Sequence, residues 1–316
     1  MLQFAADKRK GNMVKETAGP AADKNRYSLS EHVFTAPNLE PALYIVSTPI
    51  GNLGDITVRA LETLAAASVI ACEDTRVTAT LTQRFSLKTP LLPYHEHNAD
   101  KQRPKILEAL AEGRAVALVS DAGTPLVSDP GYRLVRDVVA EGHKVIPIPG
   151  ASAPLAGLVA AGLPSDTVLF AGFLPQKGGP KTRRLEELAK VPSTLIFFES
   201  PHRTAATLAL MAELLGPGRE AVVARELTKR FETFERGTLE DLSTRFEGRQ
   251  VKGEIVILVG PPEDKPEAEV DDLDALLSEA LTEMPVSAAA KKISKATGLD
   301  RNEVYKRALE LKADDA

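Results

Sequence analysis

The alternation of short apolar runs with segments of helical spacing constrains the fold of this 316-residue chain most strongly. Apolar runs of four to six residues recur at 43–46, 68–72, 91–94, 115–120 and 144–149, and segments of about ten residues separate them. Short strands joined by helices are typical of βαβ units, whose strands lie parallel in one sheet. Residues 41–163 are therefore expected to form an α/β domain around a parallel sheet.

A second series of apolar runs begins after Leu163-Pro164-Ser165-Asp166, which interrupts the first series. It comprises 167–172, 194–198, 220–224 and 254–260, again with helical segments between them. The strand-like stretch 231–237 is expected to run antiparallel to its neighbours. Residues 164–260 are therefore expected to form a second α/β domain with a mixed sheet.

The two ends of the chain depart from this pattern. Residues 1–40 lack apolar periodicity and are expected to be a disordered extension. Residues 261–272 hold six acids and one base and are expected to be a linker. Residues 273–316 contain three short helical segments, with Gly298 at a turn and Asp300 as an N-cap. They predict a small helix-turn-helix-like module.

The formal net charge of −5 belongs to one short segment of the chain. Outside the acidic linker there are 38 basic and 38 acidic residues, and residues 291–312 hold seven bases against three acids. Basic helices of this kind contact nucleic acid, form a dimerisation arm or are simply solvated, and the sequence leaves these alternatives open. The overall charge therefore does not exclude an RNA partner.

Composition limits the compartment and the kind of site. The single cysteine, Cys72, excludes an internal disulfide and a multi-cysteine metal site, and its position in a β run predicts a buried thiol. The sequence has neither a long apolar run nor the apolar core of a signal peptide, so we expect a cytoplasmic protein without a membrane span. His95-Glu96-His97 lacks the spacing of a helical zinc site, and no metal is expected.

Three Gly- and Pro-rich loops follow predicted strands, at the edge where open α/β sheets bind ligands. They are residues 47–55, 120–131 and 149–153. The sequence contains neither a Walker phosphate loop nor the glycine fingerprint of dinucleotide-binding folds. The loop 120–131 has more acids, prolines and glycines than a turn needs, so its backbone is predicted to clamp a polar cofactor. The other two loops fit a ligand site, or equally a capped turn and close helix packing.

Charged side chains follow the predicted strands at the same edge. Glu73-Asp74-Thr75-Arg76 is either a helix cap with an ion pair or a group that recognises a substrate. The segments 199–203 and 225–229 hold similar positions in the second half of the chain. The stretch 177–184 contains four cations and no acid, which suits contact with phosphate or solvation alone.

Taken in order, the motifs resemble the tetrapyrrole methylase superfamily. They are TPIGNLGDIT, ACEDTR, SDAGTP, PIPGASA, FFESPHR, RELTK and GEIVILV, and they cover residues 42–260. Within the superfamily they are most similar to the branch that methylates ribosomal RNA, since EDTR and SDAGTP with SPHR are specific for it. The corrin and porphyrin methylases carry a shorter first loop. The helical tail resembles the C-terminal helix-turn-helix-like domain of the same branch.

The resemblance implies a two-domain tetrapyrrole-methylase-like fold that binds S-adenosylmethionine in the cleft between its domains. It implies 2'-O-methylation of a cytidine ribose in the decoding region of 16S rRNA, on the assembled small subunit, by a homodimer. The implied cofactor-binding residues are Pro49, Ser120, Asp121, Ala122, Gly123, Thr124, Pro125, Ser128, Asp129, Gly150, Ala151, Ser152, Gly253, Glu254 and Ile255.

Methyl transfer to a ribose hydroxyl is an in-line displacement that depends mainly on positioning. A hydroxyl is a weak nucleophile, so a base or a hydrogen-bond acceptor should assist it. We expect the catalytic residues among Glu73, Asp74, Arg76 and Glu199, with His95 and Glu232 as further candidates for the base. Our hypothesis is that Asp74 and Arg76 lie in the acceptor pocket. The expected RNA-binding residues are His95, Lys177, Lys181, Arg183, Arg184, Arg203, Arg225 and Lys229.

Two other functions compete with this interpretation. A tetrapyrrole C-methyltransferase would need neither the basic stretch 177–184 nor the helical tail. A ribosome-binding protein without catalysis would have no use for the loops SDAGTP and PGAS. Both features therefore favour an RNA methyltransferase.

Overall fold

A computed structural model describes residues 25–128, 131–262, 270–297, 299 and 301–314. The chain separates into two compact units, 1–260 and 261–316. The expected disorder of residues 1–24, most of the linker, and the expected roles of Asp129, Gly298 and Asp300 lie outside the described residues. In the part of the chain that is described, no helix is long and apolar enough to cross a membrane.

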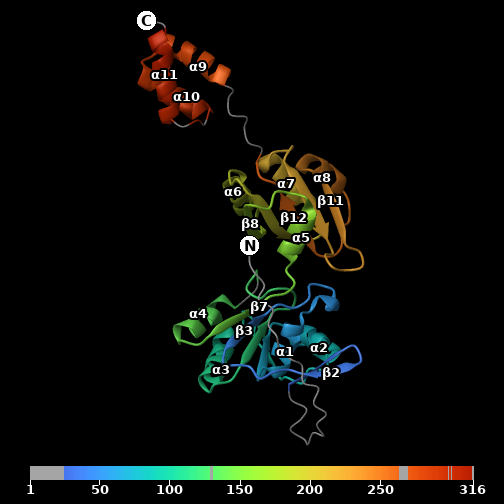
Figure 1. The fold of residues 1–316 in the computed structure, drawn as a ribbon. Coiled ribbons are helices and arrows are strands. Elements are labelled where there is room, and N and C mark those ends of the chain that lie inside the picture. The colour runs from blue at the N-terminus through green and yellow to red at the C-terminus, as the bar shows by residue number, and fades with distance from the viewer. Residues whose placement is uncertain (1–24, 129–130, 263–269, 298, 300, 315–316) are drawn as a thin grey trace, which may run out of the picture. The chain divides into compact units, whose positions relative to one another are not determined.

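The first half of the larger unit is built on a five-stranded, entirely parallel sheet (Figure 1). Its order is β5-β4-β6-β3-β7. The strands are β3 (Leu43–Val46), β4 (Val69–Cys72), β5 (Leu91–Pro93), β6 (Val116–Val119) and β7 (Val145–Ile148).

Helices cover both faces of this sheet, which is why its strands are continuous apolar runs. In β3, Tyr44 and Val46 pack into the cluster that contains α1 (Val58–Ala66) and α2 (Thr75–Arg84). Leu43 and Ile45 point to the opposite face, into the cluster of α3 (Ala99–Ala111) and α4 (Tyr132–Ala140). The thiol of Cys72 is fully buried in the first cluster, as predicted.

The strand order creates a switch point between β3 and β6. After β3 the chain crosses to β4 on one side, and after the adjacent β6 it crosses to β7 on the other. Connections that leave neighbouring parallel strands in opposite directions open a crevice at the carboxyl ends of those strands. The loop 47–55 and residues 120–128 therefore face each other across that crevice.

The second half of the larger unit has a mixed sheet in the order β11-β10-β12-β9-β8, in which only β8 and β9 pair in parallel. The strands are β8 (Val168–Phe173), β9 (Thr194–Glu199), β10 (Glu220–Arg225), β11 (Thr233–Thr238) and β12 (Ile255–Val259). Helices α6 (Gly178–Ala189), α7 (Thr204–Leu215) and α8 (Leu239–Phe246) pack on one face. Helix α5 (Ala153–Ala161) packs on the other, together with Ile50 of the first half. The predicted fold class, including the antiparallel strand at 231–237, is confirmed.

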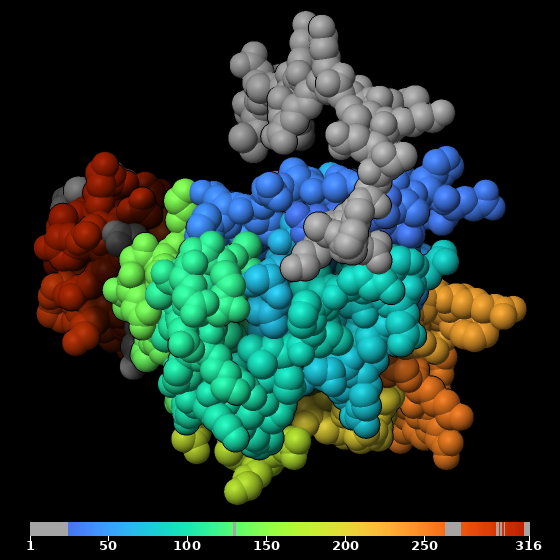
Figure 2. Space-filling model, turned by 90° about the horizontal axis from the view of Figure 1, so that it is seen from below, coloured from blue at the N-terminus to red at the C-terminus, as the bar shows by residue number. Residues whose placement is uncertain are grey.

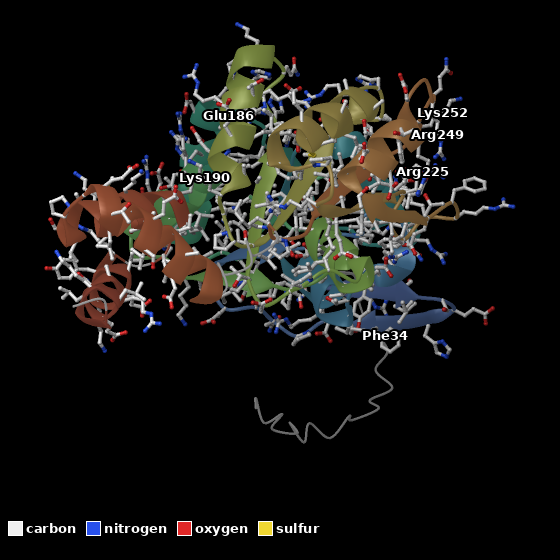
Figure 3. The ribbon with its side chains drawn as sticks, turned by 90° about the horizontal axis from the view of Figure 1, so that it is seen from above. Phe34, Glu186, Lys190, Arg225, Arg249 and Lys252 are labelled. Atoms are coloured by element: carbon white, nitrogen blue, oxygen red, sulfur yellow. The ribbon has the colours of Figure 1, made fainter. Side chains whose placement is uncertain are left out.

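A small hairpin corrects the expectation that residues 1–40 have no regular structure. Strands β1 (Arg26–Leu29) and β2 (His32–Thr35) pair antiparallel, and in Figure 2 this blue segment lies along the surface of the parallel-sheet half. Tyr27 is buried in the core and stacks on Phe34, which lies at the outer edge (Figure 3). Four-residue strands are too short to give a periodic signal. The hairpin depends on contacts that sequence spacing does not reveal, such as the bond from Ser28 N to Phe85 O (2.7 Å).

The smaller unit consists of α9 (Val270–Glu283), α10 (Val286–Thr297) and α11 (Arg301–Asp314). Leu277, Ala289 and Val304 are fully buried between the three helices. Arg307 of α11 forms a bidentate pair with Asp274 of α9, at 2.6 and 2.8 Å. Helix α9 begins three residues before the expected helix at 273.

Candidate functional site

Hydrogen bonds tie the three Gly- and Pro-rich loops together at the switch point. Thr48 and Gly123 exchange backbone hydrogen bonds of 2.9 and 3.1 Å across the crevice. The hydroxyls of Ser47 and Thr124 lie 2.9 Å apart, and Thr124 also donates to the carbonyl of Ala151 (3.2 Å). The second loop adopts left-handed backbone at Gly123 (φ +82°), where glycine is favoured.

Gly150 shows how closely the loops approach. A Cβ atom at this position would lie 2.9 Å from the Cβ of Ser47 and 3.4 Å from its carbonyl oxygen. Only a residue without a side chain fits there without displacing the backbone of the first loop. The glycine that the sequence places in the third loop is thus required by packing against the first.

These loops form one wall of a cavity of about 390 Å³, which we call the inner pocket. The second half of the chain supplies the opposite wall through Phe173, Phe198, Ser200 and Pro201. The expected cofactor-binding residues that line it are Ala122, Gly123, Thr124, Ser128, Ser152, Gly253, Glu254 and Ile255. Pro125, Gly150 and Ala151 are outside its lining, and Gly150 and Ala151 take part in the loop contacts above.

The inner pocket suits a small molecule with a flat ring system and polar groups. Its volume falls in the range of ligand sites, and its walls combine apolar side chains with loop backbone and the hydroxyls of Thr124, Ser128 and Ser152. The rings of Phe173 and Phe198 lie 5.4 Å apart at the carboxyl ends of β8 and β9. Sequence reasoning missed both rings, although the strand-end rule applies equally to the second sheet.

A larger cavity of about 660 Å³, the outer pocket, adjoins the inner one. Ile50, Ala122 and Glu254 line both cavities. The expected cofactor residues Pro49, Ser120 and Asp121 lie in the outer pocket, together with Asp74, Arg76 and Lys229. The two pockets therefore meet at a shared boundary, with a mostly apolar site on one side and a charged site on the other.

Asp74 and Arg76 form the helix cap with an ion pair and also line the outer pocket, whereas substrate recognition by this motif stays a prediction. Asp74 Oδ1 accepts from the backbone N–H of Arg76 (2.8 Å) at the start of α2, and the Arg76 guanidinium pairs with Asp74 Oδ2 (2.6 Å). The Asp74 N–H donates to Asp121 Oδ1 (3.0 Å). The hydrogen bonds from Arg76 lower the pKa of Asp74 to about 2. Asp74 is therefore ionised at neutral pH and is a poor proton acceptor.

Lys229 brings a cation to the outer pocket from the second half of the chain. Its ammonium pairs with Glu226 (3.0 Å) and Glu254 (3.2 Å). Burial alone would lower the pKa of Lys229, but the hydrogen bonds to the two carboxylates outweigh it and the pKa is raised. The side chain also lies over Gly51, where a Cβ atom would come within 2.5 Å of its Cγ.

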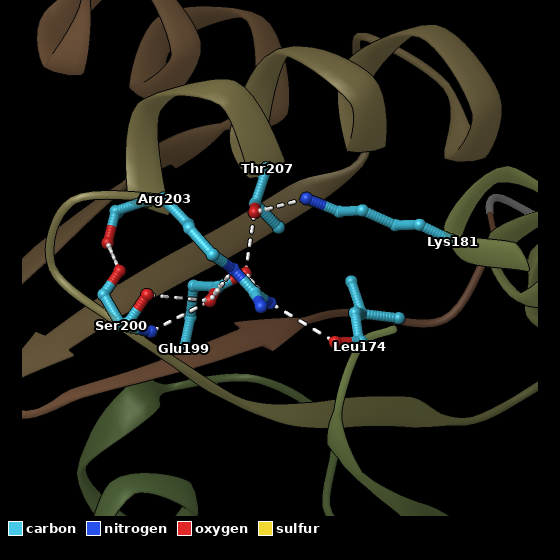
Figure 4. A network of polar contacts seen from close by, with 7 residues as sticks. Leu174, Lys181, Glu199, Ser200, Arg203 and Thr207 are labelled. Atoms are coloured by element: carbon cyan, nitrogen blue, oxygen red, sulfur yellow. Dashed lines mark hydrogen bonds and ion pairs between the residues drawn. The ribbon is translucent and has the colours of Figure 1, made fainter. Parts of the chain in front are cut away.

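Glu199 is part of a buried network rather than an available base (Figure 4). It is 3% exposed and accepts hydrogen bonds from Thr207 (2.6 Å), Arg203 (3.0 Å) and the N–H of Ser200 (2.7 Å), with Arg203 Nε as an ion-pair partner at 2.8 Å. Lys181 is 9% exposed and donates to Thr207 (2.6 Å). Glu199 thus lines the inner pocket with its carboxylate already engaged by protein donors, and Lys181 and Arg203 both have protein partners. The expected roles of the three residues in catalysis and RNA binding stay predictions.

The remaining predicted residues divide into two groups. Glu73 and His95 line a third cavity of about 490 Å³ beside Asp74, and Lys177, Arg183 and Arg184 are exposed around the start of α6. Arg225 instead donates to the carbonyl of Phe231 (3.2 Å), the Thr233 hydroxyl and the carbonyl of Lys252. Arg225 therefore has a structural role, and its expected role in RNA binding stays a prediction. Glu232 accepts from the N–H of Thr228 (2.6 Å), so its carboxylate is also engaged.

Comparisons with known proteins place these features among methyltransferases. The family model described as Tetrapyrrole (Corrin/Porphyrin) Methylases matches residues 42–243, and one described as RsmI C-terminal HTH domain matches residues 267–312. Two similar curated proteins are both named Ribosomal RNA small subunit methyltransferase I. That of Mesorhizobium japonicum is 56% identical over 87% of this chain and 93% of its own length. That of Erythrobacter litoralis is 53% identical over 89% and 99%.

Among solved structures, the methyltransferase CobJ is similar in fold. It superposes with a TM-score of 0.54 at 23% identity, over 70% of this chain and 94% of its own. Its similarity extends over most of the larger unit, in which the two sheets and both pockets lie.

Proposed function

Given that this chain belongs to the tetrapyrrole (corrin/porphyrin) methylase family, among relatives named ribosomal RNA small subunit methyltransferase I, we propose that it methylates ribosomal RNA with S-adenosylmethionine. More specifically, we propose that it transfers the methyl group to the 2'-hydroxyl of a cytidine of 16S rRNA in the small subunit. We also propose that it acts in the cytoplasm as a homodimer.

The observation that carries this proposal is the shared boundary of the two pockets at Ile50, Ala122 and Glu254. A group transfer between two bound molecules requires their reacting atoms to lie a few ångströms apart and in line. The inner pocket has the size, aromatic walls and loop backbone that a nucleoside-type cofactor requires. The outer pocket has the ionic groups that a nucleotide requires. A cofactor and an acceptor bound in these pockets would meet at the shared residues.

S-adenosylmethionine supplies a methyl group on a positively charged sulfur. In the inner pocket, Phe173 and Phe198 can pack against its ring system, and Thr124, Ser128 and Ser152 can hydrogen-bond its polar groups. Glu254 lies on the boundary, where a carboxylate favours a nearby positive charge.

In the outer pocket, Asp74 would accept a hydrogen bond from the ribose hydroxyl and fix its direction. Its low pKa makes it a positioning group, so the proton of the hydroxyl would pass to water as the methyl group is transferred. Arg76 is 89% exposed while it pairs with Asp74, so its remaining N–H groups can contact a phosphate next to the acceptor ribose. Lys229 provides a second cation in the same pocket.

The proposal is tested by supplying labelled S-adenosylmethionine with either small ribosomal subunits or free tetrapyrroles. We expect label in the ribosomal RNA alone. Label in the tetrapyrrole would favour the C-methyltransferase, and label in neither, without calorimetric binding of the cofactor, would favour a ribosome-binding protein without catalysis.

A pair of variants tests the assignment of the outer pocket. Asp74→Asn and Arg76→Ala should abolish transfer while cofactor affinity stays close to that of the unchanged protein. Glu112→Gln is a matched control, because Glu112 and Arg114 form an ion pair with the same spacing and the same 2.6 Å distance on the protein surface. A large loss of cofactor binding in the Asp74 or Arg76 variant would refute their placement beside the acceptor.

A further inference from the structure

The connection between β10 and β11, residues 226–232, presents an aromatic side chain to solvent. It joins Arg225 and Thr233, which pair directly in the sheet. In Figures 1 and 2 this yellow-orange segment projects at the edge of the larger unit. Arg230 is exposed and Phe231 is 64% exposed at its tip. A single exposed apolar ring does not by itself require a partner, so the case for binding depends on how the loop holds the ring and on what surrounds it.

The loop is held rigidly although its tip is exposed. The N–H of Lys229 donates to the carbonyl of Glu226 (3.0 Å), and the N–H of Thr228 donates to the carboxylate of Glu232 (2.6 Å). Leu227 is buried against the second sheet. Glu226 and Thr228 adopt left-handed backbone, with φ of +54° and +66°. Non-glycine residues in this conformation store strain, and such strain is concentrated at functional sites.

Arg225 anchors the aromatic residue itself. Its guanidinium donates to the carbonyl of Phe231 at 3.2 Å and, on the other side, to the carbonyl of Lys252 at 3.4 Å. Figure 3 shows Arg225 beside Arg249 and Lys252 on the same side of the molecule. The backbone of the tip is thus tied to the Arg225 guanidinium, whereas Arg249 pairs with Glu235 at 2.6 Å.

Phe231 and Arg230 together are the kinds of side chain that stack on an unpaired nucleobase. The Arg230 guanidinium lies 5.4 Å from the centre of the Phe231 ring, and most of the ring remains open. Within the described part of the chain, Arg230 forms no ion pair, so its charge is available. Aromatic rings that stack on bases, combined with arginine, are the recurring means of binding unpaired RNA.

The tip is close to the outer pocket. Lys229 lines that pocket, and Phe231 follows two residues later, so their Cα atoms are at most about 8 Å apart. We propose that Phe231, with Arg230, is a stacking platform for an unpaired base next to the nucleotide that enters the outer pocket. This inference rests on the proposed function, because it takes the acceptor to be RNA. It adds a binding residue outside the two pockets.

The kinetics of methyl transfer to small subunits test the platform. Phe231→Ala should raise KM by roughly 5- to 150-fold, the effect of losing one stacked base, with kcat nearly unchanged. Phe231→Tyr should restore KM, because it restores the ring. Phe34→Ala, at an exposed aromatic residue on the β1–β2 hairpin, should leave KM unchanged. An unaltered KM in Phe231→Ala, or no rescue by Phe231→Tyr, would overturn the proposal.

Fluorescence provides a readout that does not depend on turnover. The chain contains no tryptophan, so Phe231→Trp introduces a unique probe. A single-stranded RNA oligonucleotide that contains the target cytidine should quench this probe, and should leave the Phe34→Trp probe unquenched. Quenching that depends only on protein concentration would instead indicate a contact between copies of the chain and overturn the proposal. If the protein without substitutions fails to methylate small subunits, the proposed function is contradicted. If it is active but the Phe231 variants show neither the KM change nor the quenching, only the stacking platform is contradicted.

Discussion

Replacing Glu199 by glutamine should destabilise the larger unit strongly and weaken cofactor binding as a consequence. The carboxylate is almost fully buried and receives hydrogen bonds from Arg203, Thr207 and Ser200 (Figure 4). An amide keeps the shape of the side chain but removes the negative charge. One of its two polar ends then faces N–H donors that it cannot accept from.

The expected loss of unfolding free energy follows from the burial of the Glu199 carboxylate. Removing one partner of a buried ion pair costs about 3–5 kcal/mol, because the other charge is left uncompensated. The Arg203 side chain keeps 25% exposure and can turn partly to water, so we place the loss of unfolding free energy near the lower end, at about 3 kcal/mol. Lys181 is buried beside the same network, and burial lowers its pKa. Adding Lys181→Met to Glu199→Gln should therefore recover part of the loss.

Chemical denaturation followed by circular dichroism measures this difference. Glu187→Gln is the matched control, since Glu187 pairs with Arg184 at 3.1 Å with both side chains about half exposed. Such a surface pair contributes at most about 1 kcal/mol. Calorimetric titration should also show weaker cofactor binding in Glu199→Gln, because Ser200 and Pro201 line the inner pocket. A loss in Glu199→Gln as small as that in Glu187→Gln would refute the role of the network.

Three further perturbations have defined outcomes. Gly150→Ala should weaken cofactor binding by about tenfold, because the new Cβ atom would lie 2.9 Å from that of Ser47, whereas Gly179→Ala meets nothing within 4 Å and should be neutral. Calorimetry compares the two, and equal affinities would contradict the role of close loop packing. The pH profile of transfer should show no limb from Asp74 between about pH 5 and 8, since its pKa is lowered to about 2, and an Asp74 carboxyl resonance that titrates in this range in the NMR spectrum of the protein would contradict this. Deleting residues 270–316 should leave cofactor affinity unchanged but reduce the salt dependence of subunit binding; an unaltered salt dependence would show that the tail charges are only solvated.

The sheet architecture could be predicted because local patterns determine it. The inner strands β3, β4 and β6 of the parallel sheet are buried almost throughout, so each appears as a continuous apolar stretch, and helical segments separate these stretches. The edge of the sheet that carries the loops could also be predicted, because the loops follow the strands in the sequence. Ser120 to Thr124 follow β6 directly and Ser152 lies in the loop after β7, and they line the pockets.

The partners of charged residues could not be predicted in this way. Lys181 and Glu199 are 18 positions apart and are joined through Thr207, a residue with no sequence signal of its own. A cation in a Gly-rich stretch is therefore equally consistent with a solvated residue, a phosphate contact or a buried ion. Arg225 is a similar case, because its partners lie across a hairpin and on a separate loop.

The identity of the methylated atom tests the central claim most directly. Small subunits from cells that lack this protein are incubated with the purified protein and S-adenosylmethionine, and the 16S rRNA is digested to nucleosides for mass spectrometry. We predict that 2'-O-methylcytidine forms with the unchanged protein and is absent with Asp74→Asn. Methylation on a base, or no new methylated nucleoside, would contradict the proposed reaction.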